Sequence, residues 1–227
     1  WTLFEKTLKR IKNPIFDYPI ITTNFSYLKL VKKYLNKSKI SKYKVILEPF
    51  KKNTAPAILS SALIKEIPNN QPMIFFSSDN LIGKIKVFNK SISKYKKFLD
   101  DNNIFIFGIK PIAPSTEYGY FLSKTTSNKI NKVIKFVEKP NSKKLKLIVK
   151  KKAYMNSGMF FIRKDSIIKN FKKFQYRIFN YCNESLKKSI FRKNVYYLKK
   201  TPFKKIKEIS FDYAVLERSK NIYGIKL

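Results

Sequence analysis

The sequence of 227 residues has no histidine and a single cysteine, Cys182. Without histidine there can be no Ser-His-Asp triad, no histidine general base and no histidine-based metal site. One cysteine cannot form an internal disulfide or supply a zinc cluster. The segment around Cys182 has helical character, so we interpret this residue as part of a helix rather than as a nucleophile.

Acidic residues and arginine are also scarce. The chain has 14 acidic and 50 basic residues and a formal net charge of +36, but only five of the basic residues are arginines. Arginine is the side chain that binds phosphates and bases through paired hydrogen bonds, whereas the lysines here are spread along the whole chain. We therefore interpret the charge as a solvated lysine surface with no specific nucleic-acid partner. A non-catalytic, basic polyanion-binding protein remains an alternative.

Long apolar runs are absent as well. No stretch approaches the ~20 residues needed to span a membrane, and no signal peptide opens the chain. These absences predict no membrane partner and a cytoplasmic location. The apolar content of 44% and the aromatic content of 15% predict a folded protein with a sizeable core. We expect a single domain over residues 1–227.

Short apolar segments alternate with segments of helical periodicity in the first half of the chain. The predicted strands are residues 18–24, 43–49, 72–80 and 103–111, and the predicted helices are residues 1–12, 26–35, 55–67 and 85–101. Such alternation is typical of βαβ units. It predicts an α/β domain with a mostly parallel central sheet.

The pattern changes after Pro114. The predicted elements are a strand pair at residues 118–125 and 129–140, a helix at 141–151, a strand at 153–164, a helical segment at 166–190 and a short helix at 210–219. We expect this half to insert strands over the carboxyl edge of the sheet.

Polar residues follow several of the predicted strands, where ligands of open parallel sheets bind. Glu48, Asn53 and Thr54 come after the strand at 43–49. A carboxylate such as Glu48 can accept hydrogen bonds from both N1–H and N2–H₂ of a guanine, and the small side chain of Ala55 would let a purine approach the backbone. Thr54 also has a simpler interpretation as the cap of the helix that follows.

Asp79 ends the most apolar of the predicted strands. A carboxylate at this point could take one position on a Mg²⁺ ion that also holds phosphate oxygens. The stretch Ser-Ser-Asp-Asn is equally typical of a turn. The residues alone leave both interpretations open.

Glu138 and Lys139 stand directly before Pro140, which ends a strand, so both side chains can serve one site. Glu138 could accept from sugar hydroxyls, and Lys139 could hold a phosphate as a point charge. A surface ion pair is the alternative. Gly119 lies between two tyrosines, a pattern that often marks the close approach of a ligand or of another backbone.

The motifs LEPFKKNTAPAI, SSDN, YGY, FVEKP, MNSGMFFIR and SFDYAVLER occur in this order over essentially the whole chain. Together they resemble the bacterial mannose-1-phosphate guanylyltransferase family. The resemblance implies a Rossmann-like α/β/α nucleotidyltransferase fold. It also implies transfer of GMP from GTP to mannose 1-phosphate, giving GDP-mannose and pyrophosphate, with Mg²⁺ as the cofactor.

The resemblance also implies roles for individual residues. The segment with Glu48, Asn53, Thr54 and Ala55 would meet the guanine. Asp79 would ligate Mg²⁺, and the ammonium of Lys139 would neutralise the sugar phosphate, which makes these two the expected catalytic residues. The residues expected around the mannose are Gly119, Glu138, Asn156 and Asp212. Another sugar 1-phosphate or another nucleotide remains an alternative, and a homo-oligomer is compatible with the sequence.

The sequence departs from the family pattern in three places. It contains neither the family's glycine-rich loop with its following Pro-Lys pair nor the later W-x-D-V-G element, and Asn80 stands where the family commonly has histidine. The glycine-rich loop would normally cradle the triphosphate on backbone N–H groups. We therefore expect a domain that is incomplete at both ends and weak or inactive alone.

Overall fold

A computed structural model describes residues 2–227 of the chain; residue 1, at the start of the first predicted helix, lies outside the described residues. The helices are α1 (Leu3–Arg10), α2 (Leu28–Lys37), α3 (Thr54–Ala62), α4 (Ile85–Lys96), α5 (Ser142–Lys150), α6 (Lys164–Phe174), α7 (Tyr176–Lys187), α8 (Lys200–Lys204) and α9 (Phe211–Ala214), with short 3₁₀ turns η1 (Phe25–Tyr27) and η2 (Leu216–Arg218). The strands are β1 (Ile20–Asn24), β2 (Lys44–Glu48), β3 (Pro72–Phe75), β4 (Ile104–Ile109), β5 (Tyr120–Thr125), β6 (Asn131–Val137), β7 (Tyr154–Arg163), β8 (Ile190–Arg192), β9 (Val195–Tyr197) and β10 (Ile222–Lys226).

The strands form two sheets. One has the order β1-β2-β9-β8, and the other has the order β3-β7-β4-β10-β6-β5. Pairing is parallel among β1, β2 and β9 and between β4 and β10. It is antiparallel where the strands of the second half join, as in β5–β6 and β4–β7. The α/β class predicted from the sequence is confirmed, and the predicted strand pair at 118–140 is β5 and β6.

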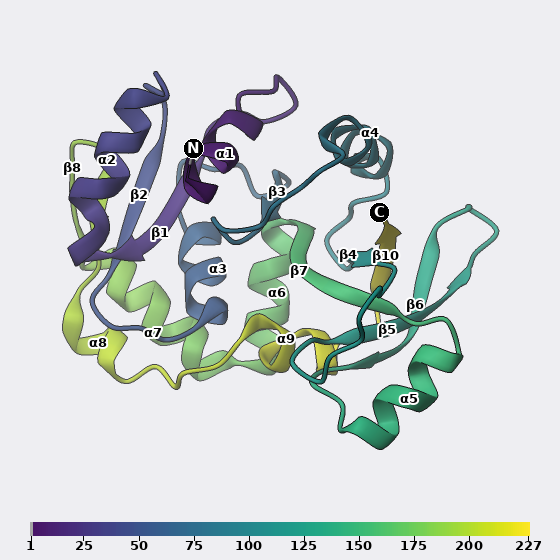
Figure 1. Cartoon of the computed structure of the whole chain (residues 1–227). Coiled ribbons are helices and arrows are strands. Elements are labelled where there is room, and N and C mark those ends of the chain that lie inside the picture. Colours follow the sequence, from purple (N-terminus) through teal and green to yellow (C-terminus); the bar gives the residue numbers. More distant parts are fainter. Residues whose placement is uncertain (1) are drawn as a thin grey trace.

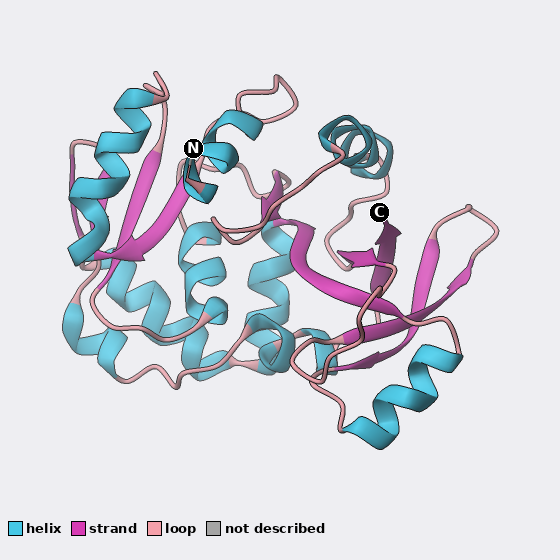
Figure 2. Ribbon diagram, viewed as in Figure 1, coloured by secondary structure: helices cyan, strands magenta, loops and turns pink. Residues whose placement is uncertain are grey.

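Helices lie on both sides of the strands, which gives the layered arrangement of a Rossmann-like fold (Figure 1). In the ribbon view, α1 and α4 lie above the strands, α2 lies at the left at the height of β1 and β2, and α3, α6 and α7 lie below (Figure 2). The largest buried cluster forms around this lower group and includes Leu59, Phe171 and Ile178. Among the described helices, none is long and apolar enough to cross a membrane.

The segment at 166–190 is largely helical, as predicted, and it consists of two helices, α6 and α7. The helix breaks at Gln175, whose φ and ψ of −142° and 50° are not helical. The Gln175 side chain donates to the carbonyl oxygen of Ala214 at 3.2 Å. Because of this break, α6 and α7 can each pack against α3. The short strands β8, β9 and β10 have no counterpart in the sequence analysis.

Turns that proteins commonly close with glycine are closed here by lysine. Lys39 and Lys152 follow the ends of α2 and α5 with φ of 52° and 58°, at the position where glycine usually ends a helix. Lys193 and Asn194, with φ of 48° and 63°, form the two-residue turn between β8 and β9, a turn that requires positive φ at both residues. Each of these lysines is exposed.

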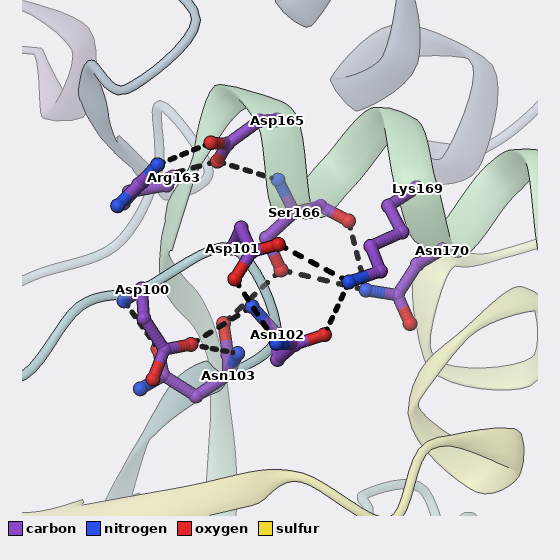
Figure 3. Close-up of polar contacts among 9 residues, drawn as sticks. All are labelled: Asp100, Asp101, Asn102, Asn103, Arg163, Asp165, Ser166, Lys169 and Asn170. Carbon is purple, nitrogen blue, oxygen red and sulfur yellow. Dashed lines mark hydrogen bonds and ion pairs between the residues drawn. The ribbon is translucent and has the colours of Figure 1, made fainter.

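A polar network joins the loop before β4 to α6 (Figure 3). Lys169 Nζ donates to Asp101 Oδ2 at 3.1 Å and to Asn102 Oδ1 at 2.5 Å. Ser166 Oγ donates to the Asn103 carbonyl oxygen at 3.3 Å. The acidic groups of this cluster are engaged by neighbouring donors, so we interpret it as a structural cross-link rather than a ligand site.

Close packing around Phe121 generates a stability prediction. A Cβ atom added at Gly108 would lie 2.4 Å from Phe121 Cζ and 2.9 Å from Tyr154 Cβ, so Gly108→Ala must displace a buried ring. We expect it to lower the free energy of unfolding by about 1–3 kcal/mol, measured by urea denaturation. Gly83→Ala is the control, because nothing lies within 4 Å of its Cβ position. Equal stability of the two variants would contradict this packing.

Candidate functional site

A hydrogen-bonded pair of polar residues joins β7 to α9. Asn156 Nδ2 donates to Asp212 Oδ1 at 2.8 Å, and the Asn156 side chain is buried. The backbone N–H of Asn156 also donates to the Gly119 carbonyl oxygen at 2.8 Å. Burial raises the pKa of Asp212, and the hydrogen bond from Asn156 opposes that rise. Three of the residues expected around a sugar are therefore connected, because Asn156 is hydrogen-bonded to both Asp212 and Gly119.

Glu138 completes this group. A Cβ atom at Gly119 would lie 2.4 Å from Glu138 Oε2, so the absence of a side chain at Gly119 makes room for the carboxyl group. Glu138 Oε2 is buried and has no hydrogen-bond partner among residues 2–227. Burial, and next the charge of Asp212, raise the pKa of Glu138 to about 7, while Lys139 acts in the opposite direction. We name the set Gly119, Glu138, Asn156 and Asp212 the carboxylate pocket.

Glu217 is an acidic residue that acts electrostatically on this pocket and that the sequence analysis did not name. Its charge contributes to the raised pKa values of both Glu138 and Asp212. Lys139, which follows Glu138, is exposed and has a φ of 42° in the left-handed region. Glu217 stands five residues after Asp212, in η2, and no sequence pattern marks its electrostatic effect on the pocket. Within residues 2–227, acidic and cysteine side chains form no group of three or more arranged to hold a metal ion.

The loop before α3 is attached to the same region. Thr54 Oγ1 accepts a hydrogen bond from the Phe211 backbone N–H at 2.9 Å, directly before Asp212. Asn53, not Thr54, is the N-cap of α3: its side chain accepts from the Thr54 N–H at 2.8 Å, and its φ is 67°. The interpretation of Thr54 as the cap is therefore wrong, because its hydroxyl is used to hold the chain before α9.

Ala55 and Glu48 point away from the exposed loop. Ala55 is fully buried, and its N–H donates to the Ile209 carbonyl oxygen at 3.2 Å. Glu48 Oε1 is buried without a partner in the described part of the chain, and burial raises the pKa of Glu48 to about 8. Its charge acts on buried Cys182 in α7. For Glu48 to contact a base, its side chain would have to turn outward, whereas Asn53 and Thr54 are already exposed.

Asp79 lies on a turn that α1 holds in place. Thr7 Oγ1 donates to the Ser78 carbonyl oxygen at 3.0 Å, and Arg10 Nη2 donates to the Asn80 carbonyl oxygen at 2.9 Å. The Asn80 side chain closes the turn by accepting from the Ser77 N–H at 2.9 Å. Asp79 itself is exposed. Asp79 is thus a turn residue with an exposed carboxylate. Its interpretation as a turn residue is therefore compatible with its interpretation as a Mg²⁺ ligand.

These segments meet at one cavity of about 620 Å³. Thr54, Ser78 and Gly158 are among the residues that line it. Thr54 comes from the loop before α3, Ser78 directly precedes Asp79, and Gly158 donates its N–H to Asn156 Oδ1 at 3.3 Å. Of the predicted site residues, Thr54 lines this cavity, and Ser78 and Gly158 in its wall are close in sequence to Asp79 and Asn156. The carboxylate pocket itself is not part of the cavity lining.

Comparisons with known proteins agree with the fold. The chain belongs to the nucleotidyl transferase family, which matches residues 1–201. Mannose-1-phosphate guanylyltransferase of Escherichia coli is 30% identical over 229 residues, which are 97% of this chain and 49% of that protein. Alginate biosynthesis protein AlgA of Pseudomonas fluorescens is 29% identical over 231 residues, which are 100% of this chain and 48% of that protein.

The chain thus spans about half the length of these relatives. A solved structure of mannose-6-phosphate isomerase from Helicobacter pylori is 27% identical, with a TM-score of 0.87. That match covers 99% of this chain and 88% of the solved chain. The resemblance to the nucleotidyltransferase fold that the sequence motifs imply is confirmed.

The buried carboxyl group of Glu48 generates a prediction about pH. A carboxyl group with a folded pKa of about 8 stays protonated while its unfolded counterpart ionises near 4.5. The folded state then binds more protons, so this group makes stability fall as pH rises from about 5 to 8. Glu48→Gln removes the effect. As pH rises from 5 to 8, we expect the free energy of unfolding of the variant to increase relative to that of the wild type by at least about 1 kcal/mol. This corresponds to roughly 2–4 °C in Tm.

The control for this measurement is Glu208→Gln, because Glu208 is exposed. Its Tm difference from the wild type should be the same at both pH values. A Glu48→Gln difference that does not change with pH would show that Glu48 is ionised in the folded protein.

Proposed function

We propose that this chain is the nucleotidyltransferase part of an enzyme that transfers GMP from GTP to mannose 1-phosphate, giving GDP-mannose and pyrophosphate. The family match and the names of the relatives support this proposal. The observation that carries it is the hydrogen bond from the Phe211 N–H to Thr54 Oγ1 at 2.9 Å. Because Asp212 follows Phe211, this bond fixes the Asn53–Thr54 loop and the carboxylate pocket side by side. We assign the base to the loop and the sugar to the pocket.

The carboxylate pocket has the chemistry to bind a sugar. Glu138 Oε2 is buried and unpartnered, and a buried polar atom of this kind is costly unless a ligand satisfies it. With a pKa of about 7, Glu138 can donate or accept a hydrogen bond near neutral pH. Asp212 is held by Asn156 and offers a second acceptor for a hydroxyl group. A pair of fixed carboxyl groups suits the vicinal hydroxyls of a pyranose.

The reaction itself needs no histidine. An oxygen of the sugar phosphate, ionised near neutral pH with a second pKa of ~6, attacks the α-phosphorus of GTP. A new P–O bond forms, the bond between the α-phosphorus and the bridging oxygen breaks, and pyrophosphate leaves with that electron pair. Catalysis of such a step depends mainly on alignment and charge neutralisation. Lys139, next to Glu138, is the cation that we assign to the sugar phosphate.

Asp79 is the residue that we assign to Mg²⁺. Its carboxylate is exposed on a turn held by Thr7 and Arg10. Magnesium in such enzymes takes one or two carboxylates together with substrate phosphate oxygens and water, so a single fixed carboxylate fits the ion. When bound, Mg²⁺ would shield the charge of the triphosphate.

Replacement of Lys139 tests the assignment of the phosphate. Lys139→Asn removes the ammonium group but keeps a residue that tolerates positive φ. We expect the Kd for GDP-mannose to rise about tenfold, because a hydrogen bond to a charged group contributes roughly 1.5–3 kcal/mol. Calorimetry in high salt is the measurement, since salt suppresses the non-specific polyanion binding expected at a net charge of +36.

Lys152→Asn is the matched control. Lys152 has the same left-handed backbone, with a φ of 58°, and it is exposed at the end of α5. Its Kd for GDP-mannose should be unchanged. Equal affinities of the two variants would remove Lys139 from the site, and RNA that displaces GDP-mannose in high salt would favour a polyanion-binding protein.

Nucleotide selectivity tests the choice of GTP. We expect GTP to raise Tm more than ATP, UTP or dTTP at equal concentration, because the nucleotide with the lowest Kd stabilises the folded state most. A ligand at 100 times its Kd stabilises the folded state by about 2.7 kcal/mol. If Glu48→Gln keeps the preference for GTP, Glu48 does not read the base. Equal stabilisation by all four nucleotides would contradict the guanylyltransferase assignment.

A further inference from the structure

The turn that carries Asp79 is held from one face of α1. Thr7 and Arg10 are three residues apart in this helix, so their side chains lie on the same face. Thr7 Oγ1 donates to the Ser78 carbonyl oxygen at 3.0 Å. Arg10 Nη2 donates to the Asn80 carbonyl oxygen at 2.9 Å. Helix α1 therefore contacts the residue immediately before Asp79 and the residue immediately after it.

Both peptide groups that flank Asp79 are hydrogen-bonded. The peptide group before it is held through the Ser78 carbonyl oxygen. The peptide group after it is held through the Asn80 N–H, which donates to the Ser77 carbonyl oxygen at 3.2 Å. Two planar peptide groups determine the φ and ψ of the residue between them. The backbone of Asp79 is therefore fixed, and only the side-chain dihedrals of its exposed carboxylate remain free.

Arg10 also determines the direction of the hydrogen bond from Thr7. Arg10 Nη2 lies 2.7 Å from Thr7 Oγ1. Because a guanidinium group only donates hydrogen bonds, Thr7 Oγ1 is the acceptor in this contact, and its own hydrogen is left for the Ser78 carbonyl oxygen. A threonine hydroxyl inside a helix can otherwise donate to the carbonyl oxygen one turn earlier. The order of donors thus runs from Arg10 through Thr7 to the turn.

The guanidinium of Arg10 is buried in making these contacts. Arg10 is 5% exposed, its Cζ lies 5.0 Å from the centre of the Phe76 ring, and burial lowers its pKa. In the described part of the chain, Nη2 makes the hydrogen bonds of this side chain and Nη1 has no partner. Burial of a charged group costs free energy. An exposed lysine, the usual basic residue of this chain, would avoid that cost.

We infer that Thr7 and Arg10 are positioning residues of the metal site: by fixing the turn around Asp79, they set how tightly the chain holds Mg²⁺ together with the nucleotide phosphates. The inference rests on the proposed assignment of Asp79 to Mg²⁺. A carboxylate on a preordered backbone loses less conformational freedom when an ion binds. Residues that orient a metal ligand typically contribute about 10–100-fold to metal affinity. Both side chains act through Asp79.

Two other roles of these side chains lead to different expectations. If α1 only stabilised the loop after β3, loss of a contact would lower Tm without changing the metal dependence of nucleotide binding. If Arg10 contacted the nucleotide directly, its loss would weaken GTP binding equally with and without metal. The quantity that separates these roles is the metal gain, which we define as the Kd for GTP in EDTA divided by the Kd for GTP at saturating Mg²⁺.

Calorimetry with GTP in high salt measures the metal gain. Thr7→Val keeps the shape of the side chain and removes the hydroxyl group. We expect it to lower the metal gain about tenfold and to leave the Kd in EDTA unchanged. Thr7→Ser, which keeps the hydroxyl group, should retain the wild-type gain. Arg10→Met should lower the gain as Thr7→Val does. Its control is Arg177→Met, which should not, because Arg177 is exposed in α7.

Asp79→Asn shows whether the effect passes through the carboxylate. This change should remove most of the metal gain, and Thr7→Val should have no further effect in its background. If Thr7→Val keeps the wild-type gain while Asp79→Asn loses it, the inference is overturned and the Mg²⁺ assignment stands. If Asp79→Asn keeps the wild-type gain, the Mg²⁺ assignment itself is contradicted, and the inference falls with it.

Hydrogen exchange tests the contact with α1 in the absence of any ligand. We expect the Asn80 amide, which is bonded to Ser77, to exchange about tenfold faster in Thr7→Val than in the wild type. The amides of β4 should keep their protection and report a folded protein. Equal exchange of the Asn80 amide in the two proteins would overturn the inference whether or not GTP binds.

Discussion

The hydrogen bond between Thr54 and Phe211 joins parts of the chain that are 157 residues apart, and the site depends on it. It fixes the segment before α9 against the start of α3, and a further bond runs from Ala55 N to the Ile209 carbonyl oxygen. Asp212 is thereby placed opposite Asn156 of β7. These contacts hold the loop after β2 next to the segment that carries Asp212.

Burial outweighs net charge in setting the electrostatics of the site. A chain with a formal charge of +36 would be expected to favour ionised carboxylates everywhere. Glu48, Glu138 and Asp212 show the opposite, because burial raises the pKa of each. The lysines are mostly exposed and screened by solvent, so they act weakly on groups inside the protein. The lysine-rich composition therefore determines the charge of the protein surface, whereas burial determines the protonation of the three carboxyl groups at the candidate site.

Much of the fold and the general position of the site could be predicted from the sequence, because alternating apolar segments and polar strand ends are local signals. The strand at residues 43–49 and the helix that follows Asn53 are examples. Tertiary partners are not local. The Thr54 hydroxyl does not cap its own helix, because it accepts a hydrogen bond from the Phe211 N–H. The charge of Glu217 acts on Asp212, and a carboxyl oxygen of Glu48 is buried. β10 is five residues long, and it forms a strand by pairing in parallel with β4.

The left-handed lysines have a consequence for heat tolerance. Lys39, Lys129, Lys152 and Lys193 all have positive φ and lie on the surface. A side chain in this conformation costs roughly 1–2 kcal/mol relative to an ordinary backbone, and the net stability of a protein is typically only about 5–15 kcal/mol. A positive-φ lysine therefore costs an appreciable fraction of the net stability of a typical protein. A lysine-rich composition with only five glycines reduces that margin at every turn where glycine would release the strain.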